Sequence, residues 1–244
     1  MKKEHVVGIA VILLVWQIAA FVVANDILIP YPMDTFVKMA NLFVRTDFYY
    51  AVGATLLRVL RGFLLSLAAA LIASILCDRF EAFRRFFTPF LQIIKTVPNI
   101  SYIVIALIWL GAEGAVSAVS FMILFPVFCN GFVNCLQNED PLFKDVVKLY
   151  PESFLFHLRL KVIPSLFPEL LSTGKTAAGL GLKVGIMAEI LGQVRIGVGR
   201  SMNYARLNLD TSAIIAWTIV IILLSTACDH VFDWLQTQQT KKEE

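Results

Sequence analysis

The chain has 244 residues, of which 58% are hydrophobic and only 16% are charged, and its mean hydropathy is +0.76. This composition is far too apolar for a water-soluble domain and predicts an integral membrane protein. The net charge of +3 comes from scattered basic residues, without the basic clusters and interleaved aromatic residues that follow a nucleic-acid backbone, so a nucleic-acid-binding protein is excluded.

Six segments are long and apolar enough to cross a bilayer, which takes about 20 residues of helix. They are residues 6–24, 52–77, 87–110, 115–136, 168–191 and 211–235. Because unpaired backbone groups are prohibitive in lipid, the spans must be helices, and we predict an all-α membrane protein forming one domain over residues 1–244. The first span lacks a small-residue cleavage site after it, so we interpret it as a retained helix rather than a signal peptide.

Between the first two spans, residues 29–51 predict an external interfacial helix with Asp34 and Thr35 as its cap. The apolar residues of this helix share one face: Phe36, Ala40, Phe43 and Val44. Farther along, the third and fourth spans are separated only by a short external link between Glu113 and Ala115. This spacing predicts a helical hairpin.

The basic residues indicate the orientation, since positive side chains are retained in the cytoplasm. With the N-terminus inside, the cytoplasmic segments hold eleven Lys and Arg residues and the external segments hold five. We therefore predict that both termini and the polar segment 137–168 are cytoplasmic.

The segment 137–168 interrupts the apolar chain and has the pattern of a helix that binds a partner. Asp145 can pair with a basic group, while Leu142, Val146, Leu149 and Tyr150 can enter a groove as an apolar face. The alternative is an amphipathic helix resting on the chain's own spans or on the membrane surface. The candidate contact residues are Asp145, Val146, Val147, Leu149, Tyr150, Pro151 and Glu152.

Polar residues inside the apolar segments are candidates for a translocation path, because such residues normally face a protein interior or water. Pro98 interrupts the third span, and Asn99, Ser101 and Tyr102 cluster beside it, as expected of a gate, of a solute contact or of a kink kept for packing. Lys183 and Glu189 are further candidates in the fifth span. Small residues in the same span predict close helix packing, within the chain or across a dimer axis: Gly174, Ala177, Ala178, Gly181, Gly185 and Ala188.

The chain offers little material for catalysis or metal binding. Its three histidines are far apart, and its four cysteines lack paired spacing. Gly174-Lys175-Thr176 does not make a phosphate-binding loop, because Glu169 stands where the first Gly is required. We expect no enzyme activity, metal or cofactor in this chain, and any ATP hydrolysis must come from another chain.

Several motifs occur in a characteristic order: Ile29-Pro30-Tyr31-Pro32-Met33, Thr55-Leu56-x-Arg58-Val59-x-x-Gly62-Phe63, Lys95-Thr96-Val97-Pro98, Ile108-Trp109-Leu110-Gly111 and Phe125-Pro126-Val127-Phe128-x-Asn130. From about residue 29 to 235 the chain resembles the membrane subunits of bacterial ATP-binding-cassette importers, in the branch of the sulfonate, taurine and nitrate permeases. Asp145-Val146-Val147 stands where that family has Glu-Ala-Ala in its coupling loop. Pro151 replaces the usual Gly, and Ile163-Pro164 ends the loop.

The resemblance implies a type I importer fold of six transmembrane helices with a cytoplasmic coupling helix in residues 137–168. It also implies a bacterial inner-membrane permease that pairs with itself or a close paralogue and binds two cytoplasmic ATPase subunits, which hold ATP and Mg. An external solute-binding protein would deliver the solute, with a sulfonate-like organic anion expected. The alternatives are a vitamin or precursor, such as riboflavin or the thiamine pyrimidine, or a secondary transporter that works without an ATPase.

Overall fold

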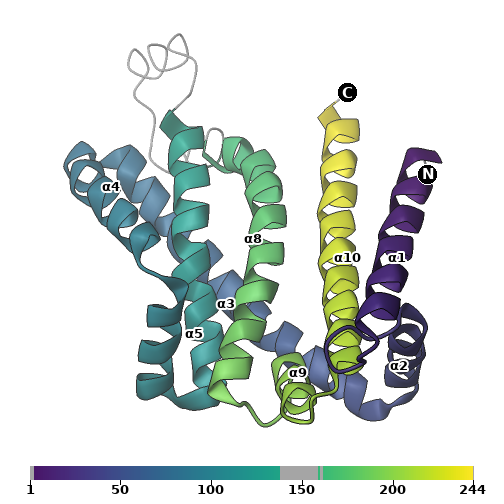
Figure 1. The fold of residues 1–244 in the computed structure, drawn as a ribbon. Helices are drawn as coiled ribbons and strands as arrows, with labels where there is room; N and C mark the ends of the chain where they lie inside the picture. The colour runs from purple at the N-terminus through teal and green to yellow at the C-terminus, as the bar shows by residue number, and fades with distance from the viewer. Residues whose placement is uncertain (1–2, 138–158, 160–161, 244) are drawn as a thin grey trace.

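In the computed structural model, residues 3–137, 159 and 162–243 are described, and they contain helices but no strand. The helices are α1 (Lys3–Val23), α2 (Pro32–Val44), α3 (Thr46–Arg79), α4 (Glu81–Thr96), α5 (Asn99–Gln137), α8 (Ile163–Gly192), α9 (Val198–Leu207) and α10 (Thr211–Glu243) (Figure 1). The all-α prediction is confirmed for this part of the chain.

Four of these helices, α1, α3, α5 and α10, are both long and apolar enough to cross a membrane. The predicted count of six spans is therefore confirmed only in part. α8 has 30 residues but is not in this set, and it carries the charged residues Glu169, Lys175, Lys183 and Glu189. The apolar composition and the four long helices establish a membrane protein that crosses the bilayer more than once.

The predicted third span, residues 87–110, is not one helix. α4 ends at Thr96, Val97 is extended with φ −69° and ψ 128°, and α5 starts at Asn99. Pro98 causes the break, because it lacks an N–H group and disfavours helical geometry in the residue before it.

α5 itself reverses direction at Gly111, whose φ of 67° and ψ of 178° favour glycine. The two halves meet in one buried cluster, to which Ile103 and Ala106 contribute from the first half and Val116 and Val119 from the second. The predicted hairpin thus exists, but its turn lies at Gly111 and not between Glu113 and Ala115.

Other observed helix boundaries also differ from the predicted ones. α8 begins at Ile163, five residues before the predicted start at 168, because Pro164 lies in the first turn, where a missing N–H costs nothing. α2 begins at Pro32 with Tyr31 as its cap residue, so the predicted cap at Asp34-Thr35 is wrong. α9 was not predicted at all, since ten residues are too short for a span.

The predicted apolar face of α2 is largely exposed, although the ring of Phe43 packs edge to face on Phe48 of α3 at 5.0 Å between centroids. Phe36, Phe43 and Val44 are exposed, with Val44 85% exposed, whereas Pro32 and Thr35 are buried. An exposed apolar face is what an interfacial helix requires.

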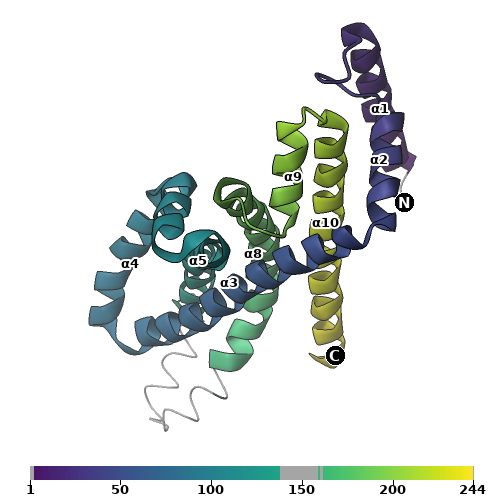
Figure 2. The ribbon, with the colours of Figure 1, turned by 90° about the horizontal axis from the view of Figure 1, so that it is seen from below.

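Both ends of the described chain lie on one side of the molecule, together with the Gln137 end of α5 and the Ile163 end of α8 (Figure 1). The lower end of α5, α2 and α9 lie on the opposite side (Figure 1), called here the outward side after the orientation predicted from the sequence. Figure 2 shows α3 running obliquely across α5, α8 and α10, from α2 at one edge to α4 at the other.

α3, α5 and α8 make the most extensive contacts and form the centre of the molecule. On the side of the termini their core is aromatic, with Phe63 and Phe128 edge to face at 5.1 Å between ring centroids and Phe128 stacked on Phe132 at 5.7 Å. On the outward side, Phe48 of α3 stacks on Trp217 of α10 at 5.4 Å. These clusters position the polar groups described next.

Candidate functional site

The break between α4 and α5 is organised around a carbonyl that has lost its helical partner. Pro98 has no N–H to donate to the carbonyl of Ile94, which instead accepts the hydroxyl of Tyr102 at 2.6 Å and the N–H of Val97 at a longer 3.4 Å. A cavity of about 150 Å³ adjoins the break, lined by Ile94, Lys95, Val97, Asn99, Tyr102, Met122, Ile123, Pro126 and Val127. The predicted polar cluster thus lies beside a cavity.

The structure brings Asn99 and Tyr102 to this cavity, while Pro98 is exposed and Ser101 is half-buried. Lys95 also lines it, from the last turn of α4. A cavity with a lysine, an amide and a hydroxyl can bind a small polar solute or pass water.

Lys183 and Glu189 lie on different faces of α8 and do not form one site. Lys183 is exposed, whereas Glu189 is completely buried. Six residues separate them, which is neither three nor four, so the two side chains do not stack on one face.

The Glu189 carboxylate is held by three groups from distant parts of the chain. The hydroxyl of Thr55 lies 3.0 Å from Oε1 and 2.9 Å from Oε2, and Nη1 of Arg58 lies 2.7 Å from Oε1. The backbone N–H of Gly199 donates to Oε2 at 2.9 Å. Thr55 in turn accepts the N–H of Val198 at 2.9 Å, so the first turn of α9 is bound at two successive residues.

Arg58 extends this network to the outward surface. Its Nη2 donates to the half-exposed carboxylate of Glu113, and its Nη1 also donates to the carbonyl of Ile196 at 2.8 Å. Glu113 accepts the backbone N–H of Arg195 at 2.9 Å. Arg58, Glu113 and Arg195 line an open outward cavity of about 710 Å³. The network therefore links α3, α5, α8 and the loop before α9.

Two glycines permit the backbone to come this close. A Cβ on Gly199 would lie 2.5 Å from the Cβ of Glu189 and 2.7 Å from the carbonyl oxygen of Ile186. A Cβ on Gly62 would lie 2.5 Å from the Cβ of Ser120, where α3 crosses α5. No larger residue fits at either position without movement of the neighbouring helix.

The small residues of α8 pack within the chain. A Cβ on Gly181 would lie 3.1 Å from Cδ1 of Leu124 in α5, and one on Gly174 would lie 2.8 Å from the ring of Phe232 in α10. Of the two predicted uses of this stripe, close packing inside the subunit is the one observed at these positions.

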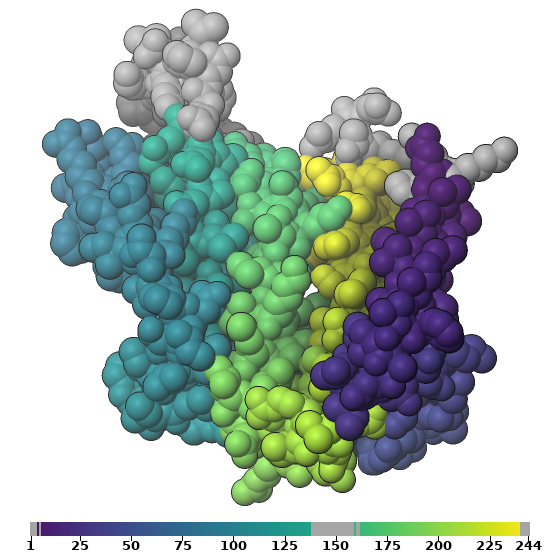
Figure 3. All heavy atoms as spheres, viewed as in Figure 1, coloured from purple at the N-terminus to yellow at the C-terminus, as the bar shows by residue number. Residues whose placement is uncertain are grey.

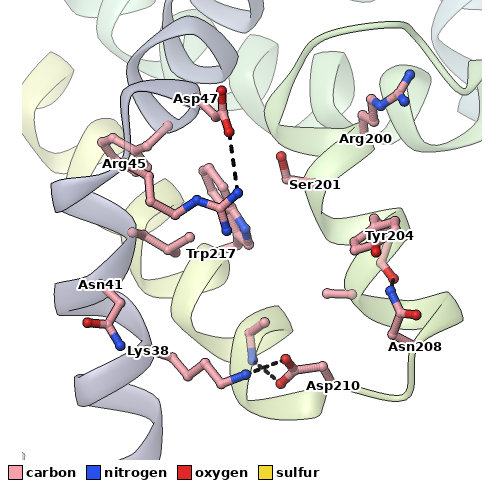
Figure 4. A pocket seen from close by; sticks show the side chains of 14 residues that line it. Lys38, Asn41, Arg45, Asp47, Arg200, Ser201, Tyr204, Asn208, Asp210 and Trp217 are labelled. Atoms are coloured by element: carbon pink, nitrogen blue, oxygen red, sulfur yellow. Dashed lines mark hydrogen bonds and ion pairs between the residues drawn. The ribbon is translucent and has the colours of Figure 1, made fainter.

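A second outward cavity, of about 380 Å³, lies between α2, α9 and the start of α10 (Figure 4). Nζ of Lys38 lies 2.5 Å from Oδ2 of Asp210 across it. Burial tends to raise the pKa of Asp210, but the hydrogen bonds from Lys38 and from the N–H of Ala213, with the Lys38 charge, outweigh burial and hold the pKa below its ordinary value. This ion pair fastens α2 to α10.

A protein-family model described as the inner membrane component of binding-protein-dependent transport systems matches residues 62–243. The chain belongs to this family. The chain is thus a permease subunit, and its relatives are named as transport permease proteins and not as enzymes.

Individual relatives support the same family. The permease is 23% identical to the putative aliphatic sulfonates transport permease protein SsuC of Bacillus subtilis over 237 residues, which cover 95% of this chain and 84% of that protein. It is 22% identical to a putative ABC transporter permease protein of Methanocaldococcus jannaschii, covering 96% and 91% of the two chains. A probable ABC transporter permease protein of Brucella abortus is 22% identical over 222 residues, covering 89% and 87%.

The predicted coupling residues of the permease lie outside the described residues. They are Asp145, Val146, Val147, Leu149, Tyr150, Pro151 and Glu152. Their contact with an ATPase stays a prediction.

Sequence reasoning gave no role to Thr55, Arg58, Glu113 or Gly199. Thr55 and Arg58 were quoted within the second-span motif, and their spacing of three residues places them on one helix face. This spacing indicated from the sequence that the two side chains could bind a common partner. Their common partner lies more than 130 residues away, at Glu189, so the pairing itself was not visible in the motif.

Proposed function

We propose that this permease is the membrane subunit of an ATP-driven importer of a small organic anion of the sulfonate type. The observation that carries this proposal is the match over residues 62–243 to the inner membrane component of binding-protein-dependent systems. The sulfonate class is supported by the similarity to SsuC, whose name specifies aliphatic sulfonates.

Two permease chains, or this chain and a close paralogue, would enclose the path, and two cytoplasmic ATPase subunits would bind the segment 137–168. An external solute-binding protein would deliver the anion to the outward side. The termini and both ends of that segment share one side of the molecule (Figure 1), which supports a cytoplasmic position for all of them.

The path residues take two roles in this proposal. Pro98, Asn99, Ser101 and Tyr102 form the gate region at the break between α4 and α5, beside a cavity. Glu189 does not line the path in this proposal, because its carboxylate accepts hydrogen bonds from Thr55, Arg58 and Gly199. It positions the outward loop that ends the path.

ATP-driven closure of the ATPases would move the coupling segments together and shift the helices between inward-open and outward-open states. The test is uptake of labelled ethanesulfonate into liposomes that contain the permease, its ATPase and its binding protein. Replacing Asp145 and Tyr150 by alanine is expected to leave the assembled complex intact but to uncouple ATP hydrolysis from uptake.

Two outcomes contradict the proposal. Unchanged coupling in the Asp145 and Tyr150 variants would remove the role of the segment 137–168. Uptake by the permease alone, driven by an ion gradient without ATPase, would place the chain among secondary transporters.

A further inference from the structure

α8 has two faces of opposite character. One is buried against α3, α5 and α10 and includes the small residues Gly174, Ala177, Gly181, Gly185 and Ala188. The other is exposed along the helix and contains Ser172, Thr176, Lys183, Met187 and Leu191. Their spacings of four, seven, four and four residues keep them on one side of a helix with 3.6 residues per turn.

The first three residues of this exposed face are polar, and none has a partner among the residues that the structure describes. In the described part of the chain, Lys183 has no ion pair or hydrogen bond, and the hydroxyls of Ser172 and Thr176 bond to nothing. Lys175, on the neighbouring face of the same helix, differs sharply, because its Nζ lies 2.6 Å from Oδ1 of Asp233. Among the described residues, the polar side chains of the exposed face thus lack the hydrogen-bond and ion-pair partners that Lys175 has.

Lipid is a poor environment for this face. A charged side chain within the bilayer is costly and normally faces a protein interior or a water-filled cavity. Lys183 lies about 13 Å along the helix from its Gly192 end, taking a rise of about 1.5 Å per residue. Snorkelling towards the interface could satisfy Lys183 alone, but it leaves Thr176, about two turns away near the middle of the helix, without water.

In Figure 3, α8 runs down the front of the molecule with no described helix over it, and Ser172, Thr176 and Lys183 are exposed in a single chain. We infer that the face of α8 made by Ser172, Thr176 and Lys183 lines the aqueous translocation path and that Lys183 selects an anionic solute. An ammonium group with neighbouring hydroxyl donors suits the oxygens of a sulfonate, carboxylate or phosphate. This inference rests on the proposed function and names the residues that would contact its solute.

The first test asks whether water reaches this face in a membrane. Thr176→Cys is introduced into a permease whose four native cysteines are replaced by serine, and proteoliposomes are treated with a membrane-impermeant, negatively charged thiol reagent. If the cysteine-free chain does not fold, Thr176→Cys is labelled in the native background and the native labelling is subtracted. The matched control is Ile12→Cys on α1, 67% exposed and surrounded by apolar residues.

Labelling at Thr176→Cys at least ten-fold faster than at Ile12→Cys is expected. Equal, slow labelling at the two positions would place this face in lipid and overturn the inference. This readout needs neither ATPase nor solute, so its outcome is separate from that of the proposed function.

The second test concerns selectivity. In the reconstituted complex, Lys183→Met is expected to lower ethanesulfonate uptake at least ten-fold, and Lys183→Arg is expected to retain most of it. Lys175→Met is the control for loss of a lysine on the same helix and is expected to reduce uptake far less. Native uptake in Lys183→Met would refute the selectivity role, whereas absence of ATP-driven uptake in the native complex would instead count against the proposed function.

Discussion

The outward end of the permease and the break between α4 and α5 are stabilised in opposite ways. At the outward end, Glu189 is buried with hydrogen bonds from α3 and from the first turn of α9, and Arg58 carries the network to α5. At the break, one hydroxyl bond from Tyr102 replaces a lost helical bond beside a cavity. We therefore expect the outward end to be the more rigid region and the break to be the more deformable one, since the Glu189 network links several helices at once.

The rigid region predicts the largest effect. Arg58→Ala removes the only cation at Glu189 among the described contacts and leaves a buried carboxylate, so we expect a loss of about 3–5 kcal/mol in the free energy of unfolding. Thermal and denaturant unfolding in detergent micelles measure this. Arg45→Ala is the control, because Arg45 forms an exposed pair with Asp47 and should cost at most about 1 kcal/mol. Equal stability of the two variants would show that the network is not rigid.

The close crossing of α3 and α5 predicts the next effect. Gly62→Ala forces a Cβ to within 2.5 Å of the Ser120 Cβ, and we expect destabilisation by about 1–3 kcal/mol. Gly53→Ala, in the same helix with nothing within 4 Å, should stabilise the helix by about 0.5–1 kcal/mol. The two changes should shift the unfolding midpoint in opposite directions, and a shared sign would refute the close packing.

The deformable region predicts a smaller change. Tyr102→Phe removes the donor to the Ile94 carbonyl, which is expected to cost about 0.5–1.5 kcal/mol of stability. If the break is the gate, transport coupling should change more than the unfolding midpoint does. Tyr204→Phe, at a 70% exposed side chain, is the control. Normal coupling in Tyr102→Phe would assign the break to packing alone.

The Lys38–Asp210 pair should have the smallest effect, and it depends on pH. The pKa of Asp210 lies below its ordinary value of about 3.9, so its contribution to stability is complete above that value and is lost as the pH falls through the folded pKa. Unfolding midpoints between about pH 7 and pH 3 should therefore converge for the native chain and Asp210→Asn at the acidic end. A constant difference across this range would contradict the prediction.

The fold was largely predictable where local rules decide. Pro98 interrupted the chain as a proline must, and the short link after Leu110 predicted the hairpin, although the turn lies at Gly111. Residues 87–110 form parts of two helices, α4 and α5, with the break at the predicted interruption, although the prediction counted them as a single span. The roles of the site residues were harder to predict from the sequence. Lys183 and Glu189 are both charged residues within an apolar helix, and they differ only in what surrounds them.

Composition and helical length by themselves determined that this is an all-α membrane protein with a polar segment between its fourth and fifth predicted spans, because the cost of polar groups in lipid acts on every short window of sequence. Only the tertiary structure decided the partner of each intramembrane charge. Glu189 meets Thr55 and Arg58 from 134 and 131 residues away, and Lys183, on the other face of the same helix, meets no partner among the described residues. A helix has a buried and an exposed face only once it is packed. The packing of α3 and α5 against one side of α8 gave these two charges their different environments.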